Sequence, residues 1–119
     1  MNLLIQALNG VLIAGLGEIV ALGGRAGLEP SDILNVVQLT SLNSVFIRDK
    51  IGAFSNAGKS PVEQPLHLLQ KDLHLTVGFS QRMEQPIPMT SAANEVLKSA
   101  AKSGCKYKDA SAVYQCAKL

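Results

Sequence analysis

Two histidines are the first residues whose type and spacing suggest metal binding. His67 and His74 lie seven residues apart, with Lys71 between them on the same face of a predicted helix. Two histidines that share a metal on one helix are normally four residues apart, and a lysine between the rings repels a cation. We therefore expect no metal site, and we expect both histidines to face solvent or a cleft.

Two glycine-containing segments fail the spacing of a phosphate-binding loop. The segment AGKS ends at Ser60, but a phosphate loop would need glycine at position 53, which is Ala53, and Pro61 blocks a following helix. The segment GLGEIV has Val20 where a dinucleotide loop needs its third glycine, and it lies inside a predicted helix. No set of Ser, His and Asp or of Cys and His stands out as a nucleophilic site. The sequence therefore favours a chain without catalytic residues of its own.

Cys105 and Cys116 are too few for a disulfide-dense scaffold. We predict two thiols in a reducing compartment, with a single local disulfide as the alternative.

The elements that position these residues begin with a long apolar run. From Leu3 to Leu22, fourteen of twenty residues are apolar and three are glycine. The run is long enough to span a membrane, which takes about 20 residues. However, Glu18 lies inside it, no Lys or Arg precedes it, and Asn2, Gln6 and Asn9 form a polar stripe along one helical face. We therefore predict a core helix with one polar, solvent-exposed edge; a membrane or signal segment is the alternative.

The residues that typically begin or end helices, together with the spacing of apolar residues, predict helices throughout and no strand. Gly27 closes the first helix, Pro30 opens the second, and Asp109 caps a short final helix. The apolar face of the helix that follows Pro65 is wide, so we expect that helix to be largely enclosed. The prediction is one all-α domain of about six helices over 1–119, with a loop at 52–65. The helices are expected near 3–25, from 30, at 45–51, from 66, from about 90 to before Gly104, and from 109.

Composition supports a folded domain and excludes some partners. The chain has 119 residues, of which 47% are hydrophobic and 17% charged, with a net charge of +2. This charge is too small for a dedicated nucleic-acid binder or a polybasic membrane surface. The chain also has no Trp for stacking against bases. A late group of lysines is interpreted as a solvated face: Lys98, Lys102, Lys106 and Lys108.

Several short motifs in the second half resemble the C-terminal helical domain of the β-hydroxyacid dehydrogenase family. That family includes 3-hydroxyisobutyrate dehydrogenase and the glyoxylate and succinic semialdehyde reductases. Upstream, Glu18 and the segment RAGLEP are also similar to family features. The matching motifs are Lys71–Leu73, Pro86–Pro88, Ala93–Glu95 and Asp109–Tyr114. The resemblance implies a C-terminal fold similar to that of 6-phosphogluconate dehydrogenase, with the N-terminal Rossmann domain absent from this chain.

The resemblance also implies a degenerate substrate cleft. Family enzymes carry a catalytic lysine and an asparagine where this sequence has Asn2 and Gln6, and a cleft phenylalanine where it has Gln64. An amide does not titrate near neutral pH, so it cannot act as a general acid. Lys71, which in the family approaches the nicotinamide cofactor, and Asp72 are retained.

The function implied by these departures is assembly without catalysis. The segments PMTSAANEVLKSA and SAVYQ are most similar in sequence to a nuclear, chromatin-associated branch of the family. We therefore expect a nuclear, non-catalytic domain that forms a dimer or tetramer through its first helix, with chromatin proteins as further partners and no membrane. No cofactor is expected on this chain alone; NAD(P) would need a Rossmann domain. The alternative is the substrate and dimerisation domain of an active NAD(P)-dependent dehydrogenase or reductase in the cytoplasm or mitochondrion.

Overall fold

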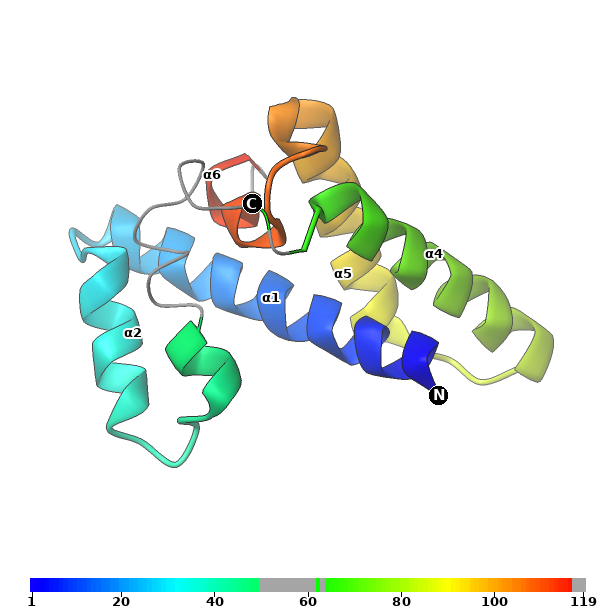
Figure 1. Cartoon of the computed structure of the whole chain (residues 1–119), viewed down its shortest axis with the longest axis horizontal. Coiled ribbons are helices and arrows are strands. Elements are labelled where there is room, and N and C mark those ends of the chain that lie inside the picture. Colours follow the sequence, from blue (N-terminus) through cyan, green and yellow to red (C-terminus); the bar gives the residue numbers. More distant parts are fainter. Residues whose placement is uncertain (50–61, 63, 117–119) are drawn as a thin grey trace.

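The computed structural model of this chain describes residues 1–49, 62 and 64–116, and over these residues it is helical. Their only extended pairing is an isolated bridge between Pro65 and Asp109. The predicted all-α class is confirmed. The elements, labelled in Figure 1, are α1 (Asn2–Arg25), α2 (Pro30–Gln38), α4 (Leu66–Met83), α5 (Pro88–Ala100), a π-helical turn η1 (Ala101–Cys105), a 3-10 turn η2 (Ala110–Ala112) and α6 (Val113–Cys116).

The long helix α1 runs through the middle of the molecule, and α4 and α5 pack together against it (Figure 1). One face of α1 is buried, and Gly10 on this face lets the side chain of Leu73 from α4 approach the helix backbone. The predicted core helix is therefore correct for one face of α1. The main core is formed by Ile13, Ala14, Leu66, Leu69, Leu73, Ala93, Leu97, Ala100, Cys105, Ala110, Ala112 and Val113.

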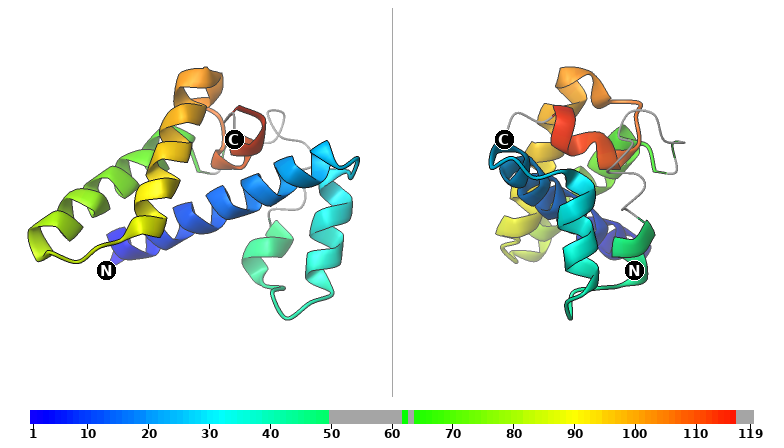
Figure 2. Two further views of the ribbon diagram at one scale, coloured as in Figure 1. Left: turned by 180° about the vertical axis from the view of Figure 1, so that it is seen from behind. Right: turned by 90° about the vertical axis from the view of Figure 1, so that its left-hand side faces the viewer.

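The second helix, α2, packs beside the C-terminal end of α1, away from α4 and α5 (Figure 2). A small separate core joins the two helices, in which Val20 and Leu34 are buried and Leu16 and Tyr114 are partly buried. Residues 45–49 are helical, as predicted, and the Ile47 N–H donates to the Ser44 hydroxyl at 3.2 Å. Positions 50 and 51 of that predicted helix, and most of the predicted 52–65 loop, lie outside the described residues.

The corner between α1 and α2 has the hydrogen bonds of a Schellman motif. The Leu28 N–H donates to the Gly23 carbonyl at 2.9 Å, and the Gly27 N–H donates to the Gly24 carbonyl at 3.1 Å. Gly27 has φ +92°, in the left-handed region that a glycine enters without a steric penalty. Pro30 then fixes the first residue of α2, so both predicted signals are confirmed.

The helix α4 is less enclosed than its wide apolar face predicts. Leu66, Leu69 and Leu73 are buried, but Leu68 and Leu75 remain 49% and 47% exposed. The apolar face is wider than the surface that α1 and α5 cover, so its outer edge stays open within the described part of the chain.

The chain after α5 differs in detail from the prediction. The helix begins at Pro88, slightly before the expected start, and instead of stopping cleanly before Gly104 it continues as the π-helical turn η1. Gly104 lies inside that turn with φ +106°. Asp109 is the predicted N-cap, since its carboxylate accepts from the Ser111 N–H at 3.0 Å, although the first turn it caps is a 3-10 turn.

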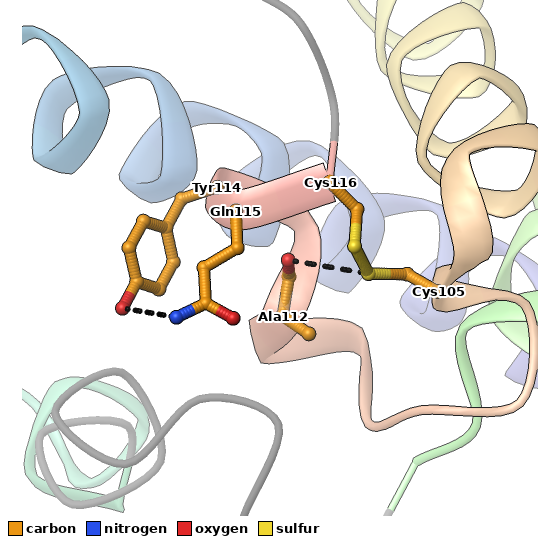
Figure 3. Close-up of a disulfide and its surroundings, with 5 residues drawn as sticks. All are labelled: Cys105, Ala112, Tyr114, Gln115 and Cys116. Atoms are coloured by element: carbon orange, nitrogen blue, oxygen red, sulfur yellow. Dashed lines mark hydrogen bonds between the residues drawn. A yellow bond between two sulfur atoms is a disulfide. The ribbon is translucent and has the colours of Figure 1, made fainter.

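The two cysteines form a disulfide, so the prediction of two thiols is wrong and its alternative holds (Figure 3). Cys105 ends η1 and Cys116 ends α6, and their Cα atoms are 6.0 Å apart. A spacing of 11 residues does not by itself indicate this contact, which depends on the turn that folds α6 back beside η1.

Candidate functional site: an amide-lined hollow

A hollow of 450 Å³ lies between the first turns of α1 and the start of α4. Its lining combines side-chain amides, one carboxylate and an apolar floor, and comes from Gln6, Asn9, Gln64, Pro65, Leu68, Leu69 and Asp72. Gln6 and Asn9 are on α1 and Asp72 is on α4, so the packing of these two helices creates the hollow.

Three amide side chains in the hollow bind one another. The Gln64 Nε2 atom donates to Gln6 Oε1 at 2.8 Å. The Asn9 Nδ2 atom donates to Gln64 Oε1 at 3.0 Å, and it lies 3.5 Å from Gln6 Oε1. All three side chains are partly buried. We call Gln6, Asn9 and Gln64 the amide triad. Its members use donors and acceptors on each other that a ligand would otherwise meet.

Gln64 is held in place by the C-terminal segment. Its N–H donates to the carboxylate of Asp109 at 2.9 Å, and its carbonyl accepts from the Ala110 N–H at 2.8 Å. The Asp109 side chain is buried and also accepts from the Ser111 hydroxyl at 2.6 Å. The hollow therefore depends on residues that are distant in the sequence.

The structure brings together three of the five residues that the family resemblance implies for the cleft. Gln6, Gln64 and Asp72 line the hollow. Asn2, at the first residue of α1, and Lys71, on α4, are exposed and stand outside this lining.

The cleft prediction missed Asn9, which completes the amide triad. The signal was present in the polar stripe of α1, because Asn9 lies one turn after Gln6 on the same face. A second polar contact was also missed: Gln70 Nε2 donates to Oδ1 of the buried Asn94 at 2.8 Å and links α4 to α5. Asn94 belongs to one of the motifs that resemble the family, and here it has a structural partner.

The lining of the hollow is suited to polar contact and poorly suited to acid–base chemistry. Amides do not exchange a proton near neutral pH, and Asp72 is the one titratable side chain among the described lining residues. A dinucleotide pyrophosphate needs backbone N–H groups at a helix start or a cationic side chain. The hollow presents neutral amides and a carboxylate, so its residues do not fit that group. In addition, the described residues contain no cluster of three or more His, Cys, Asp or Glu side chains that could hold a metal ion.

Comparison with known proteins identifies the fold and the family. Residues 1–117 match the family model described as the NAD-binding domain of NADP-dependent 3-hydroxyisobutyrate dehydrogenase. A solved 3-hydroxyisobutyrate dehydrogenase from Salmonella typhimurium superimposes with a TM-score of 0.85 at 30% identity, covering 96% of this chain and 40% of that one.

The relatives of known name include a nuclear factor and a reductase. The cytokine-like nuclear factor N-PAC of Aedes aegypti is 44% identical over 96% of this chain and 20% of its own length. The chloroplastic glyoxylate/succinic semialdehyde reductase 2 of Arabidopsis thaliana is 30% identical over 99% of this chain and 33% of its own length. The chain thus spans about a fifth of the N-PAC relative and a third of the reductase. With its helices and motifs in the family's order, it belongs to the 3-hydroxyisobutyrate dehydrogenase family, as a counterpart of that family's helical domain.

Proposed function

We propose that this chain is a non-catalytic, dehydrogenase-like domain that assembles with further copies of itself through an exposed face of α1. The observation that carries the proposal is a stripe of apolar side chains along the whole helix. Leu8, Leu12, Ile19 and Leu22 are 57%, 46%, 54% and 67% exposed, and Leu4 extends the stripe toward the first turn. We call Leu4, Leu8, Leu12, Ile19 and Leu22 the α1 stripe.

The spacing of the α1 stripe suits a helix partner. Its members follow one another at intervals of three, four or seven residues, which places them on one side of the helix. Gly15 lies within the stripe, and a Cβ atom there would meet nothing within 4 Å. A second helix can therefore approach the backbone closely at this point. A continuous apolar face of this length is typical of an interface.

A membrane is the competing occupant of the same face. The helix α1 is long and apolar enough to cross a membrane by length and composition, and 33% of its most apolar window is buried. Glu18 is exposed within the helix, and a carboxylate at membrane depth costs several kcal/mol. The buried side of α1 is also occupied by α4 and α5, which favours a protein partner.

Sedimentation velocity at micromolar concentration tests this proposal. We expect a dimer or larger assembly, and we expect Leu12→Glu to shift it to monomer while the circular dichroism spectrum is unchanged. Leu75→Glu is the matched control, because Leu75 on α4 is 47% exposed and Leu12 is 46% exposed. A wild-type monomer, or cosedimentation with phosphatidylcholine vesicles that Leu12→Glu abolishes, would contradict assembly through α1.

The proposed loss of catalysis rests on Asn2 and on the amide triad. The relation to a glyoxylate/succinic semialdehyde reductase favours enzymatic activity as the alternative. Assays of the intact protein for NADPH oxidation with short aldehydes distinguish the two. We expect no turnover with Asn2 in place. Turnover with Asn2 in place would overturn the non-catalytic proposal.

The similarity to N-PAC, a protein named as a nuclear factor, supports a nuclear location. Chromatin proteins remain the further partners that the family resemblance implies. Imaging of the tagged intact protein tests the location, and a cytoplasmic or mitochondrial signal would favour the enzyme alternative.

A further inference from the structure

The disulfide closes a loop that holds two helices at once. Cys105 is fully buried in the main core, whereas Cys116 is only partly buried. Between them run η2 and α6, which fold back over the middle of α1 (Figure 3). The contact with α1 is close, because a Cβ atom on Gly17 would lie 2.8 Å from a methyl carbon of Val113.

The start of the same loop pairs with the start of α4. The Leu66 N–H donates to the Lys108 carbonyl at 2.9 Å, and the His67 N–H donates to the Lys106 carbonyl at 3.0 Å. One residue further, Asp109 accepts from the Gln64 N–H. We call residues 105–116 the C-terminal clasp, because they contact both α1 and α4.

The fold accommodates both oxidation states of the two sulfurs. The Cys105 Sγ atom lies 3.7 Å from the carbonyl oxygen of Ala112 (Figure 3). A disulfide sulfur has no hydrogen to donate, but a thiol at the same place finds this acceptor already in position. Reduction therefore leaves Cys105 with a hydrogen-bond partner in the core.

We propose that Cys105 and Cys116 form a thiol–disulfide switch that sets how firmly the C-terminal clasp holds α1, α4 and the amide triad. The couple that operates it is a small thiol and its disulfide, such as glutathione. In reduction, a small thiolate attacks the sulfur of Cys116, the less buried residue of the pair. The S–S bond breaks, and Cys105 leaves with the electron pair and takes a proton. A second small thiolate then releases Cys116, which takes a proton, and forms the small-molecule disulfide, so two electrons pass to the protein.

The switch reaches the hollow through Gln64. Its backbone is bound to Asp109 inside the C-terminal clasp, and its side chain is bound to Gln6 and Asn9. An intact disulfide restricts the conformations of residues 105–116 when they detach, and this restriction is lost in the dithiol. Reduction therefore increases local opening of the clasp and, with it, of the first turn of α4.

Thiol counting and hydrogen exchange test the switch on the whole chain. The folded protein is treated with oxidised glutathione or dithiothreitol, and its thiols are counted with iodoacetamide after unfolding in urea, because Cys105 is buried. We expect no cysteine to react after oxidised glutathione and both to react after dithiothreitol. Amides in 64–69 and 105–116 should then exchange about tenfold or more faster in the reduced protein, while amides in 90–97 of α5 stay unchanged. Thiols that stay reactive after oxidised glutathione, or equal exchange in the two states, would overturn the proposal.

Two variants keep the test specific. In Cys116→Ser, whose substituted side chain is only partly buried, dithiothreitol should no longer change exchange anywhere. Asp109→Asn leaves one carboxamide oxygen where the carboxylate has two, so the link to Gln64 weakens while the disulfide stays intact. We expect this variant to raise exchange in 64–69 even when oxidised. Exchange in 64–69 that responds to dithiothreitol in Cys116→Ser would show that the reagent acts elsewhere and would contradict the switch.

Discussion

The two ends of α1 are packed very differently. From its middle, Ile13 and Ala14 join a main core that, among the described residues, has twelve buried members and is shared with α4, α5 and the C-terminal clasp. Its last turns share with α2 a smaller core, in which two of the described residues, Val20 and Leu34, are buried. At that end Val36, Leu39, Leu42 and Val45 remain between 61% and 87% exposed. The difference indicates that packing among α1, α4, α5 and the C-terminal clasp contributes most of the domain's free energy of unfolding. The contacts between α1 and α2 contribute less.

The largest effect is expected in the main core. Leu73→Ala removes a fully buried side chain that packs against Gly10 of α1. We expect a loss of about 3 to 5 kcal/mol in the free energy of unfolding, measured by urea denaturation at one fixed protein concentration. A loss below about 1 kcal/mol would show that the two cores do not differ as described.

The matching change at the other end should cost less and act locally. Leu34→Ala removes a fully buried side chain from the small core, which among the described residues has fewer buried members than the main core. We expect about 2 kcal/mol, with faster hydrogen exchange confined to α2 and the last turns of α1. Faster exchange throughout α4 and α5 would mean that the two ends unfold as one unit, against the comparison drawn above.

Glycine substitutions on α1 sharpen the contrast between a filled and an open site. A Cβ atom at Gly10 would lie 2.5 Å from a methyl carbon of Leu73, so Gly10→Ala should destabilise the domain by about 1 to 2 kcal/mol. At Gly24 nothing lies within 4 Å, and Gly24→Ala should stabilise by about 0.5 to 1 kcal/mol through helix propensity. Thermal unfolding measures both changes in stability. Changes of the same sign in Gly10→Ala and Gly24→Ala would contradict the prediction.

The smallest effect belongs to the surface of α5. Lys98 Nζ lies 3.2 Å from Glu95 Oε1, and the two side chains are 43% and 70% exposed. Glu95→Gln should change the free energy of unfolding by no more than about 0.5 kcal/mol, because water and salt screen exposed pairs. A larger change in urea denaturation would require a role for Glu95 beyond this ion pair.

Features set by neighbouring residues were predictable from the sequence. Gly27 and Pro30 mark the corner between α1 and α2 because each acts through its own backbone, and Asp109 caps the residues that follow it. The all-α class follows from the same kind of local signal. These signals need no knowledge of what lies across the fold.

Features that depend on distant contacts were not predictable in the same way. The disulfide needs α6 beside η1, and the amide triad needs Gln64 beside α1, 55 residues after Asn9. The exposed edge of α4 was also missed, because periodicity shows which side chains are apolar but gives no width for the surface that covers them. Asn9 could have been found, since its polar stripe was visible and only its partner was unknown.

The first turn of α4 depends on a cap that lies about 40 residues further along the chain. Leu66 and His67, at its start, donate to the carbonyls of Lys108 and Lys106, and no side chain among the described residues caps the helix at this end. Contacts this distant in sequence form only after a large loop has closed, which slows their appearance during folding. During synthesis the beginning of α4 therefore emerges well before the residues that complete it. We therefore expect its first turn to become ordered later in folding than its middle turns, which pack against α1.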